Sequence, residues 1–358
     1  MPMPLSQLYN TVEWAYILHQ VRWMIRIALI ISIGINIRYA FETKYKGIPV
    51  FILVIGILII YLVNFKLAAE VMFLPCNQLQ LKSKNENTLS PDRLVIGVYN
   101  NGEAKAYPIE FLAYHHQIID TIGNKIFMIT YCSVCRTARV FEPYINGRYT
   151  AFRLVGMDHF NAMFEDDITG SWWRQATGEA ICGPSKGQLL KEHSASQLSI
   201  AKWFELYPSG KVMQANPPFL KDYDPKAKYE KGKSISSLTR RDAHFLMPKS
   251  WVVGVKYKEQ TKAYDWNLLV QQSLIQDTIA ASPIFIVLSK DAQSFAAFEN
   301  PTNETINLHK DTICMGDNKY DLLGTSYTSS SKLYKIQCYQ EYWHSWKYFH
   351  PNTLVYSK

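Results

Sequence analysis

The sequence predicts a strand-rich α+β protein in which an N-terminal two-helix transmembrane hairpin precedes an internally duplicated extracytoplasmic region. Three observations lead to this fold class: two apolar segments near the start of the chain, a long stretch that recurs later with its spacing intact, and strand-like runs separated by Asn-Gly turns. The chain has 358 residues, of which 48% are apolar and 19% charged. A chain of this composition buries a large core, which excludes a disordered protein.

Residues 23–66 contain the two predicted membrane spans. Ile48 to Val63 has no charged or strongly polar side chain, and with the residues that follow it is long enough to cross the hydrocarbon core. Trp23 to Ala40 is interrupted by polar side chains, but its arginines stand near its ends, where they can extend toward the lipid headgroups. The two segments are expected to form a helical hairpin, with the lipid bilayer as its partner.

The charges around the spans predict their orientation. The connecting loop carries Arg38, Lys44 and Lys46 against a single Glu42, an excess that the N-terminal segment, residues 1–22, does not match. The positive-inside rule therefore places the loop in the cytoplasm and the main domain on the extracytoplasmic side of the inner membrane. No small-residue cleavage site follows the first apolar run, which favours an anchor over a cleaved signal peptide.

The net charge of +8 is a weak indication of contact with anionic surfaces. The lysines concentrated between Lys221 and Lys233 are typical of a solvated linker, so no nucleic-acid partner is predicted.

Beyond the hairpin the chain resembles itself. Leu94 to Glu142 aligns with Trp251 to Glu299 at a constant offset (264 − 107 = 157), which superimposes Lys105-Ala106-Tyr107 on Lys262-Ala263-Tyr264. Later, Trp203 and Pro208 match Trp346 and Pro351 at a smaller offset (351 − 208 = 143). Chance does not maintain such a register, so two related lobes are predicted, at residues 67–213 and 251–358, joined by a linker at 214–250.

Each lobe is expected to begin with the same elements. In the first lobe these are a hairpin around Asn100-Asn101-Gly102, a helix from Ile109 to Ile122, a strand from Ile126 to Thr130, a hairpin from Val140 to Val155 around Asn146-Gly147, and a closing helix near Ser196 to Leu206. Between the strand and the second hairpin stands Thr130-Tyr131-Cys132-Ser133-Val134-Cys135-Arg136.

This turn places two thiols where both can point into one small volume. Cys132 and Cys135 can share a metal ion, form a thiol/disulfide couple, or simply belong to a structural turn. The comparison between lobes bears on this choice, because Cys132, Cys135 and His115 are replaced by Ser289, Ala292 and Gln272 in the second copy. The second copy keeps the residues that define the fold and lacks the thiols and the imidazole. This difference favours a site in the first lobe and a supporting role for the second.

From about Leu94 to the C-terminus the chain resembles a large prokaryotic family catalogued only as a domain of unknown function. The resemblance is carried by His115, Asp120, Thr130-Tyr131-Cys132 with Cys135, and two later stretches, Ser171-Trp172-Trp173-Arg174-Gln175 and Gly178-Glu179-Ala180-Ile181-Cys182-Gly183-Pro184. Ser133-Val134 departs from the Pro-Leu that is common between the family's cysteines. The family brings no established activity, so the resemblance implies the fold and the position of the site.

The candidate metal ligands are Cys132, Cys135, His115 and His159, where His159 is expected to share a helical face with Met163. Sulfur and imidazole donors suit zinc, copper or iron. Glu179 is a candidate general base and Arg174 a candidate substrate-facing residue. The structural alternatives are a histidine satisfied by a carbonyl, an ion-paired Glu179, and an Arg174 that satisfies strand-edge carbonyls.

Three functions remain open at this point: a transition-metal or redox site with an unknown substrate, a thiol-disulfide oxidoreductase, and a non-catalytic envelope binding or scaffold module. The six cysteines are also compatible with disulfides in an exported domain, with a bridge between Cys314 and Cys338 as one option. No serine-nucleophile motif, phosphate-binding glycine loop or zinc-protease helix is present.

Overall fold

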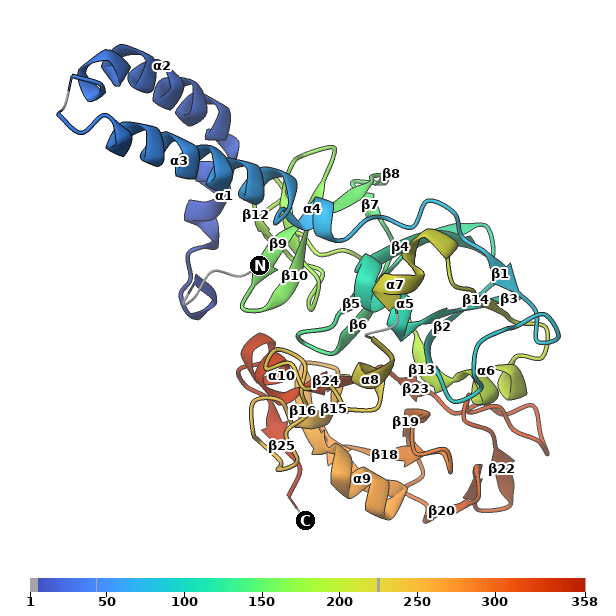
Figure 1. Cartoon of the computed structure of the whole chain (residues 1–358). Helices are drawn as coiled ribbons and strands as arrows, with labels where there is room; N and C mark the ends of the chain where they lie inside the picture. Colours follow the sequence, from blue (N-terminus) through green and yellow to red (C-terminus); the bar gives the residue numbers. More distant parts are fainter. Residues whose placement is uncertain (1–5, 43, 224–225, 358) are drawn as a thin grey trace. The chain divides into compact units, whose positions relative to one another are not determined.

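The computed structural model describes residues 6–42, 44–223 and 226–357 (Figure 1). The protein is α+β and rich in strands, as predicted. It forms two compact units: unit 1 comprises Met1–Leu74, Thr150–Arg174 and Glu179–Leu189, and unit 2 comprises Pro75–Tyr149, Gln175–Gly178 and Leu190–Lys358. Residues 1–5 of the predicted N-terminal segment, residues 224–225 of the predicted linker, and residue 358 lie outside the described residues.

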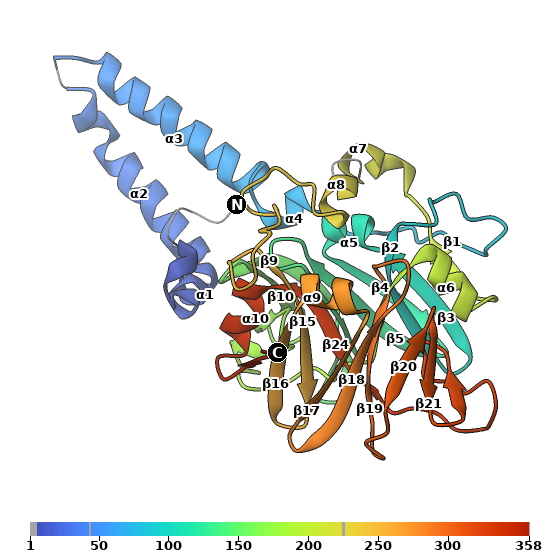
Figure 2. The same ribbon diagram turned by 90° about the horizontal axis from the view of Figure 1, so that it is seen from below.

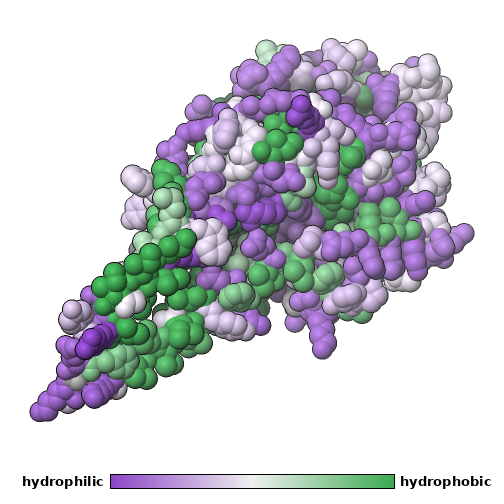
Figure 3. All heavy atoms as spheres, turned by 90° about the horizontal axis from the view of Figure 1, so that it is seen from above, coloured by the Kyte–Doolittle hydropathy of each residue, from purple (hydrophilic) through white to green (hydrophobic). Residues whose placement is uncertain are grey.

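Unit 1 begins with helices. These are η1 (Ser6–Leu8), α1 (Val12–Gln20), α2 (Arg22–Ala40), α3 (Gly47–Phe65) and α4 (Ala69–Met72). Both α2 and α3 have 19 residues and are apolar enough to cross a membrane by length and composition. At a rise of about 1.5 Å per residue, each matches a hydrocarbon core of about 30 Å. Figure 3 shows the outward side chains of this hairpin as a continuous hydrophobic surface.

The polar side chains inside the hairpin are hydrogen-bonded. Arg26 Nη2 donates to Asn64 Oδ1 across the two helices, and Asn64 Nδ2 donates to the carbonyl of Ile60. These bonds satisfy groups that would be costly to leave unpaired in hydrocarbon.

The rest of unit 1 is an antiparallel four-stranded sheet of order β12-β11-β10-β9. Its strands are β9 (Phe152–Asp158), β10 (Asn161–Asp166), β11 (Trp172–Arg174) and β12 (Ala180–Cys182). The helix predicted to carry His159 and Met163 is wrong, because His159 and Phe160 form a two-residue loop between β9 and β10. The short apolar run of β10 did not distinguish a strand from a helix. Trp172 and Trp173 are buried strand residues.

The first half of unit 2 is built from two sheets. One has the order β1-β14-β3-β2-β13 and the other the order β4-β5-β6. Their elements are β1 (Leu81–Lys82), β2 (Leu94–Asn100), β3 (Glu103–Pro108), α5 (Ile109–His115), β4 (Gln117–Ile122), β5 (Lys125–Cys132), β6 (Thr137–Phe141), β13 (Ser196–Ser199), α6 (Ile200–Leu206) and β14 (Lys211–Met213). The expected hairpin at Asn146-Gly147 is the short pair β7 (Tyr144–Ile145) and β8 (Arg148–Tyr149).

The second half repeats this order of elements. Its members are β15 (Trp251–Tyr257), β16 (Gln260–Asp265), α9 (Trp266–Gln272), β17 (Leu274–Ile279), β18 (Ser282–Leu288), β19 (Phe295–Glu299), β23 (Lys335–Ile336), β24 (Cys338–Tyr342), α10 (Trp343–Phe349) and β25 (Leu354–Val355), with β20 (Ile306–His309), β21 (Thr312–Met315) and β22 (Asn318–Tyr320) as a separate sheet. The sheet β24-β15-β16-β25 pairs its strands in the same senses as β13-β2-β3-β14. Figure 2 shows β15, β16 and β24 of the first of these sheets beside one another. Internal duplication itself stays a prediction.

Two predicted helices are shorter than expected. The helix predicted from Ile109 to Ile122 ends at His115, because His116 adopts a left-handed conformation (φ 60°) and the chain continues as β4. A left-handed residue closes a helix, and it reverses the chain here so that β4 pairs with β5. The closing helix begins at Ile200 rather than Ser196, since residues 196–199 pair with β2.

The predicted linker is more ordered than its composition indicates. It contains η2 (Pro217–Phe219), α7 (Leu220–Tyr223) and α8 (Lys226–Glu230). Tyr223, Tyr229 and Glu230 are buried, and a Glu230 carboxylate oxygen accepts the backbone N–H of Leu94 at 3.2 Å. The segment therefore packs as part of unit 2.

A glycine under a tryptophan occurs in each half. A Cβ added to Gly97 or Gly254 would come closer than 3.0 Å to Trp203 or Trp346, respectively. We expect Gly97→Ala to destabilise the protein by about 1–3 kcal/mol, because the fully buried indole cannot move aside. Thermal unfolding in detergent measures this, with Gly47→Ala as the control, since nothing lies within 4 Å of its added Cβ. Equal melting temperatures for the two variants would contradict the packing described here.

Candidate functional site

The cysteine turn connects two paired strands of unit 2. β5 ends at Cys132, β6 begins at Thr137, and Arg136 adopts the left-handed conformation (φ 56°) that turns the chain between them. Both cysteines have no exposed surface. Their thiols are hydrogen-bonded to each other, and burial together with this bond raises the pKa of Cys135 well above its usual range. The resting state of Cys135 is therefore the protonated thiol.

The second half of unit 2 supplies the other side of this site. The backbone N–H of Tyr342 donates to the carbonyl of Cys135 at 2.9 Å, at the start of α10. One turn later, the Ser345 hydroxyl is hydrogen-bonded to the Cys135 thiol, which lowers the pKa of that thiol, and it donates to Glu341 Oε2 at 3.2 Å. The turn of the first lobe is thus completed by a helix of the second.

Lys249 is the cation beside the thiols. The first N–H groups of a helix have no acceptor within the helix itself. In α10 these N–H groups, those of Trp343 and His344, donate to the carbonyls of Ser250 and Pro248, which fixes the backbone on either side of Lys249. Lys249 Nζ then donates to the carbonyl of Val134 at 2.6 Å, inside the cysteine turn. Burial lowers the pKa of Lys249 to about 8, although the two nearby cysteines raise it.

His344 lies next to this lysine. Its Nε2 is 3.0 Å from Lys249 Nζ and 3.2 Å from the carbonyl oxygen of Val134. Burial, followed by the charge of Lys249, lowers the pKa of His344 to about 3, so the ring is neutral at physiological pH. With an unprotonated Nε2, the ring accepts a hydrogen bond from the Lys249 ammonium, and the Val134 carbonyl then accepts from Lys249 rather than from the ring.

Two buried arginines anchor the strands that carry the turn. Arg139 has an ion pair with Glu341, and its guanidinium lies 3.5 Å from the centre of the Tyr339 ring. Arg136 donates to Gln340 Oε1 at 2.9 Å and lies 3.8 Å from the centre of the Trp251 ring. Every partner named here belongs to the second half of unit 2, so these contacts fix the turn against α10.

The residues predicted from sequence fall into different places. Cys132, Cys135 and His115 belong to unit 2, whereas His159, Arg174 and Glu179 belong to unit 1. Within unit 2, His115 Nε2 and the Tyr223 hydroxyl form a hydrogen bond of 2.6 Å. No three His, Cys, Asp or Glu side chains form a group that could hold a metal ion anywhere in the described ranges. Metal binding by these residues stays a prediction.

Unit 1 gathers its three predicted residues around a fourth. Asp158 accepts from His159 Nδ1 at 2.6 Å and from Arg174 Nη2 at 2.7 Å, and Arg174 Nη1 lies 3.3 Å from Glu179. Neither Asp158 in this cluster nor Lys249, His344 and Ser345 in unit 2 was identified from sequence. The signal that points to His344 and Ser345 is their position directly before Trp346, which the predicted duplication matches with Trp203.

The structure contains no disulfide among the six cysteines, all of which lie within the described residues. The optional bridge between Cys314 and Cys338 is therefore not formed here. Cys314 lies on β21 and Cys338 on β24.

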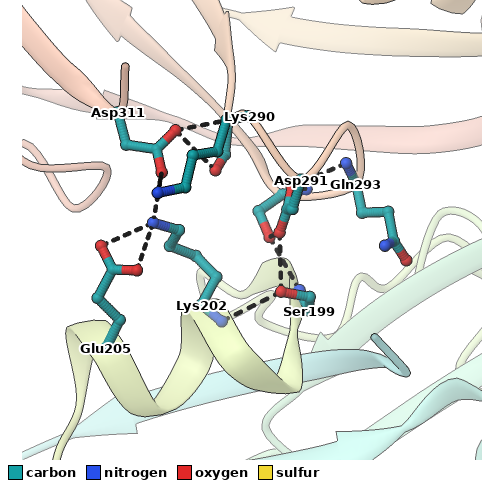
Figure 4. Close-up of polar contacts among 9 residues, drawn as sticks. Ser199, Lys202, Glu205, Lys290, Asp291, Gln293 and Asp311 are labelled. Carbon is teal, nitrogen blue, oxygen red and sulfur yellow. Dashed lines mark hydrogen bonds and ion pairs between the residues drawn. The ribbon is translucent and has the colours of Figure 1, made fainter. Parts of the chain in front are cut away.

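The counterpart turn, from Ser289 to Ser294, closes without thiols. Asp291 Oδ1 accepts the backbone N–H groups of Gln293 and Ser294, and Asp291 Oδ2 accepts the hydroxyls of Ser294 and Ser199 (Figure 4). Ser199 is the N-cap of α6, so this turn contacts the closing helix of the first lobe. Each of the two turns contacts the helix that closes the other half of unit 2, and the counterpart turn is closed by backbone hydrogen bonds and carboxylates rather than thiols.

A buried ion pair completes the counterpart contact. Lys202 Nζ donates to Asp311 Oδ2 and to Glu205, both at 2.7 Å, and Asp311 Oδ1 accepts from Ser289 at 2.9 Å (Figure 4). At the smaller repeat offset, Lys202 corresponds to Ser345 (345 − 202 = 143). The cysteine turn has a hydroxyl at the position where its counterpart has a structural lysine.

Comparison with known proteins confirms the resemblance found in the sequence. A family model described as "Protein of unknown function (DUF3179)" matches residues 77–353. No curated protein and no solved structure matches the chain.

The closure of the counterpart turn can be tested by Asp291→Ala. We expect a loss of about 1–3 kcal/mol in the free energy of unfolding, because four donors lose their acceptor and three of them belong to the buried residues Ser199 and Ser294. Denaturant titration measures this loss. Asp317→Ala, at an exposed turn residue of the same half, is the control. The same stability for both variants would show that the carboxylate does not close the turn.

Proposed function

The chain belongs to the DUF3179 family, and we propose that it is a membrane-anchored extracytoplasmic protein whose Cys132 and Cys135 form a redox-active dithiol. The observation that carries the proposal is the contact of both thiols with each other beside the amine of Lys249. Two thiols in contact need little rearrangement to become a disulfide, and a neighbouring cation stabilises the thiolate through which thiols react.

The reaction is a thiol-disulfide exchange. One cysteine thiolate attacks a disulfide of a partner and forms a mixed disulfide, releasing one thiol. The second cysteine attacks this intermediate, so that Cys132 and Cys135 end as a disulfide and the partner as two thiols. Two electrons and two protons pass from the cysteine pair to the partner, and the reverse direction oxidises a dithiol partner.

Lys249 has a specific role in this reaction. With a pKa of about 8, a fraction of its amine is neutral at physiological pH and can take the proton of a cysteine. The ammonium formed then stabilises the thiolate beside it. His344, which is neutral, accepts a hydrogen bond from this ammonium and keeps it against the turn.

Access to the sulfurs requires a local movement. The two residues between the cysteines, Ser133 and Val134, are only 8% and 9% exposed, and the cysteines beneath them have no exposed surface. Lys249 holds the carbonyl of Val134. Exchange with a partner therefore proceeds from an opened form of this turn.

The helices of unit 1 supply the anchor. The basic loop between the two apolar helices supports an orientation in which the domain lies outside the cytoplasm, and disulfides form and persist in such a compartment. A dithiol there meets both disulfide and dithiol partners, which a cytoplasmic thiol pair does not.

Metal content and thiol oxidation together test the proposal against the metal-site hypothesis. In purified full-length protein we expect less than stoichiometric zinc, copper and iron by elemental analysis. We also expect the peptide containing Cys132 and Cys135 to lose two hydrogens reversibly in a dithiothreitol redox buffer, as shown by mass spectrometry. Cys314→Ser is the control and should behave like the wild type. One metal ion per chain that disappears in Cys132→Ser, or a pair that never oxidises, would overturn the proposal.

The role of Lys249 predicts a pH effect. In Lys249→Met the thiols lose the neighbouring cation, so we expect the pH profile of their alkylation by iodoacetamide to move upward by about one pH unit. The direction follows because the ammonium lowers the pKa of Cys135 and its removal raises that pKa further. Lys231→Met, at an exposed lysine paired with Asp92, is the matched control. A profile unchanged by Lys249→Met would exclude this role.

A further inference from the structure

An apolar cavity of about 570 Å³ lies between the two long helices of unit 1. Its walls are residues 33–40 of α2 and residues 48–53 of α3, where the lining side chains recur at helical spacing. They therefore belong to the facing surfaces of the two helices. A volume in the range of roughly 300–1,000 Å³ is typical of sites that bind small molecules. Half of the lining residues are isoleucine or leucine: Ile33, Ile37, Ile48, Ile52 and Leu53.

The cavity occupies the loop end of the hairpin. Phe41 and Tyr45, which lie between the two helices, also line it. Along residues 33–40 an α-helix advances about 10 Å, which is less than the roughly 15 Å of hydrocarbon in one leaflet of a bilayer. At the opposite end of the hairpin the helices are joined by the hydrogen bond from Arg26 to Asn64. The cavity is therefore limited to the leaflet next to the loop.

The wall of the cavity offers few polar groups. Asn36 and Tyr45 are the only lining residues with polar side-chain atoms. The amide nitrogen of Asn36 donates to the carbonyl of Ser32 at 2.8 Å, within α2 itself. A polar ligand would lose hydrogen bonds to water that this wall does not replace, whereas a hydrocarbon chain loses none.

The mouth of the cavity is basic. Lys44 Nζ lies 5.9 Å from the centre of the Tyr45 ring, which lines the cavity. Lys46 directly precedes α3, and both lysines are exposed. With Arg38 in the last turn of α2, three cations stand at this end of the hairpin against the single carboxylate of Glu42. A cluster of this kind next to a membrane span attracts anionic lipid headgroups.

We propose that the cavity binds one acyl chain of an anionic phospholipid from the leaflet on the loop side, with the lipid phosphate beside Lys44 and Lys46. A membrane helix of another chain fits these observations less well. Such a helix crosses both leaflets, and close packing of helices in membranes uses small side chains rather than isoleucine and leucine. The lipid site rests on the membrane anchoring in the proposed function and is independent of the dithiol.

Native mass spectrometry of the full-length protein in a mild detergent tests the acyl-chain site. The probes are phosphatidylglycerol and phosphatidylcholine with the same acyl chains. We expect one phosphatidylglycerol to be retained per chain, and Ile37→Trp to weaken this binding by about tenfold because the indole fills the cavity. Ile35→Trp is the matched control, since Ile35 lies on the same helix, is 65% exposed and does not line the cavity. Equal weakening by both variants, or a second copy of the chain retained in place of the lipid, would overturn the site.

The headgroup contact is tested by removing the two lysines. We expect wild-type protein to bind phosphatidylglycerol at least fivefold more tightly than phosphatidylcholine, and the double variant Lys44→Gln and Lys46→Gln to lose this preference. Lys66→Gln, at the opposite end of α3, is the control and should keep it. A preference that survives the double variant would contradict the proposed position of the phosphate.

Alkaline carbonate extraction of membranes separates this proposal from the membrane anchor. A wild-type chain released into the soluble fraction would overturn the anchor, and the lipid site with it. A chain that stays in the membrane fraction but binds both lipids equally would overturn the lipid site alone.

Discussion

The geometry of the cysteine site depends on one packing contact. The sharp turn between β5 and β6 packs against α10, a helix from the other half of unit 2. The carbonyl of Cys135 accepts the N–H of Tyr342 at the start of α10, and the Arg139–Glu341 ion pair joins the same two segments beneath the surface. A buried ion pair needs complete partners, so this contact leaves little freedom in how β6 meets α10. Because the turn has one position relative to α10, Ser345, His344 and Lys249 have one position relative to the sulfurs.

The counterpart turn shows what is structural in this arrangement and what is not. There a carboxylate, Asp291, accepts the donors that close the turn, and the helix contributes Lys202 to an ion pair. The cysteine turn lacks these groups: it contains two thiols, and beside them lie the hydroxyl of Ser345 and the amine of Lys249, whose pKa burial lowers to about 8. A turn at the corresponding position is closed by backbone hydrogen bonds and carboxylates, without cysteines. The position of the two cysteines beside a titratable amine therefore indicates a chemical role rather than a structural one.

Local patterns predicted local structure and missed long-range contacts. The apolar spans, the Asn-Gly hairpins and the strand leading to Cys132 follow from hydropathy and turn chemistry, and the structure has them. The end of α5 at His115 could not be predicted from these patterns. Residues 109–122 have an apolar spacing compatible with one continuous helix, and only pairing with β5 makes β4 a strand. The contacts of Lys249 and His344 with Val134 span 115 and 210 residues. Nothing in a lysine of an apparent linker, or in a histidine near the end of the chain, indicates such contacts. His159, Arg174 and Glu179 were found by residue type, but their shared partner Asp158 was not.

The central claim is that Cys132 and Cys135 exchange electrons with a partner in the cell while the protein is anchored in its membrane. Acid-quenched alkylation of intact cells tests this most directly, because acid traps thiols and disulfides before lysis changes them. The account predicts that the peptide with Cys132 and Cys135 is recovered as both dithiol and disulfide, and that its disulfide fraction follows the redox state of the extracytoplasmic compartment. A pair recovered wholly as thiols, under oxidising and reducing growth conditions alike, would contradict it.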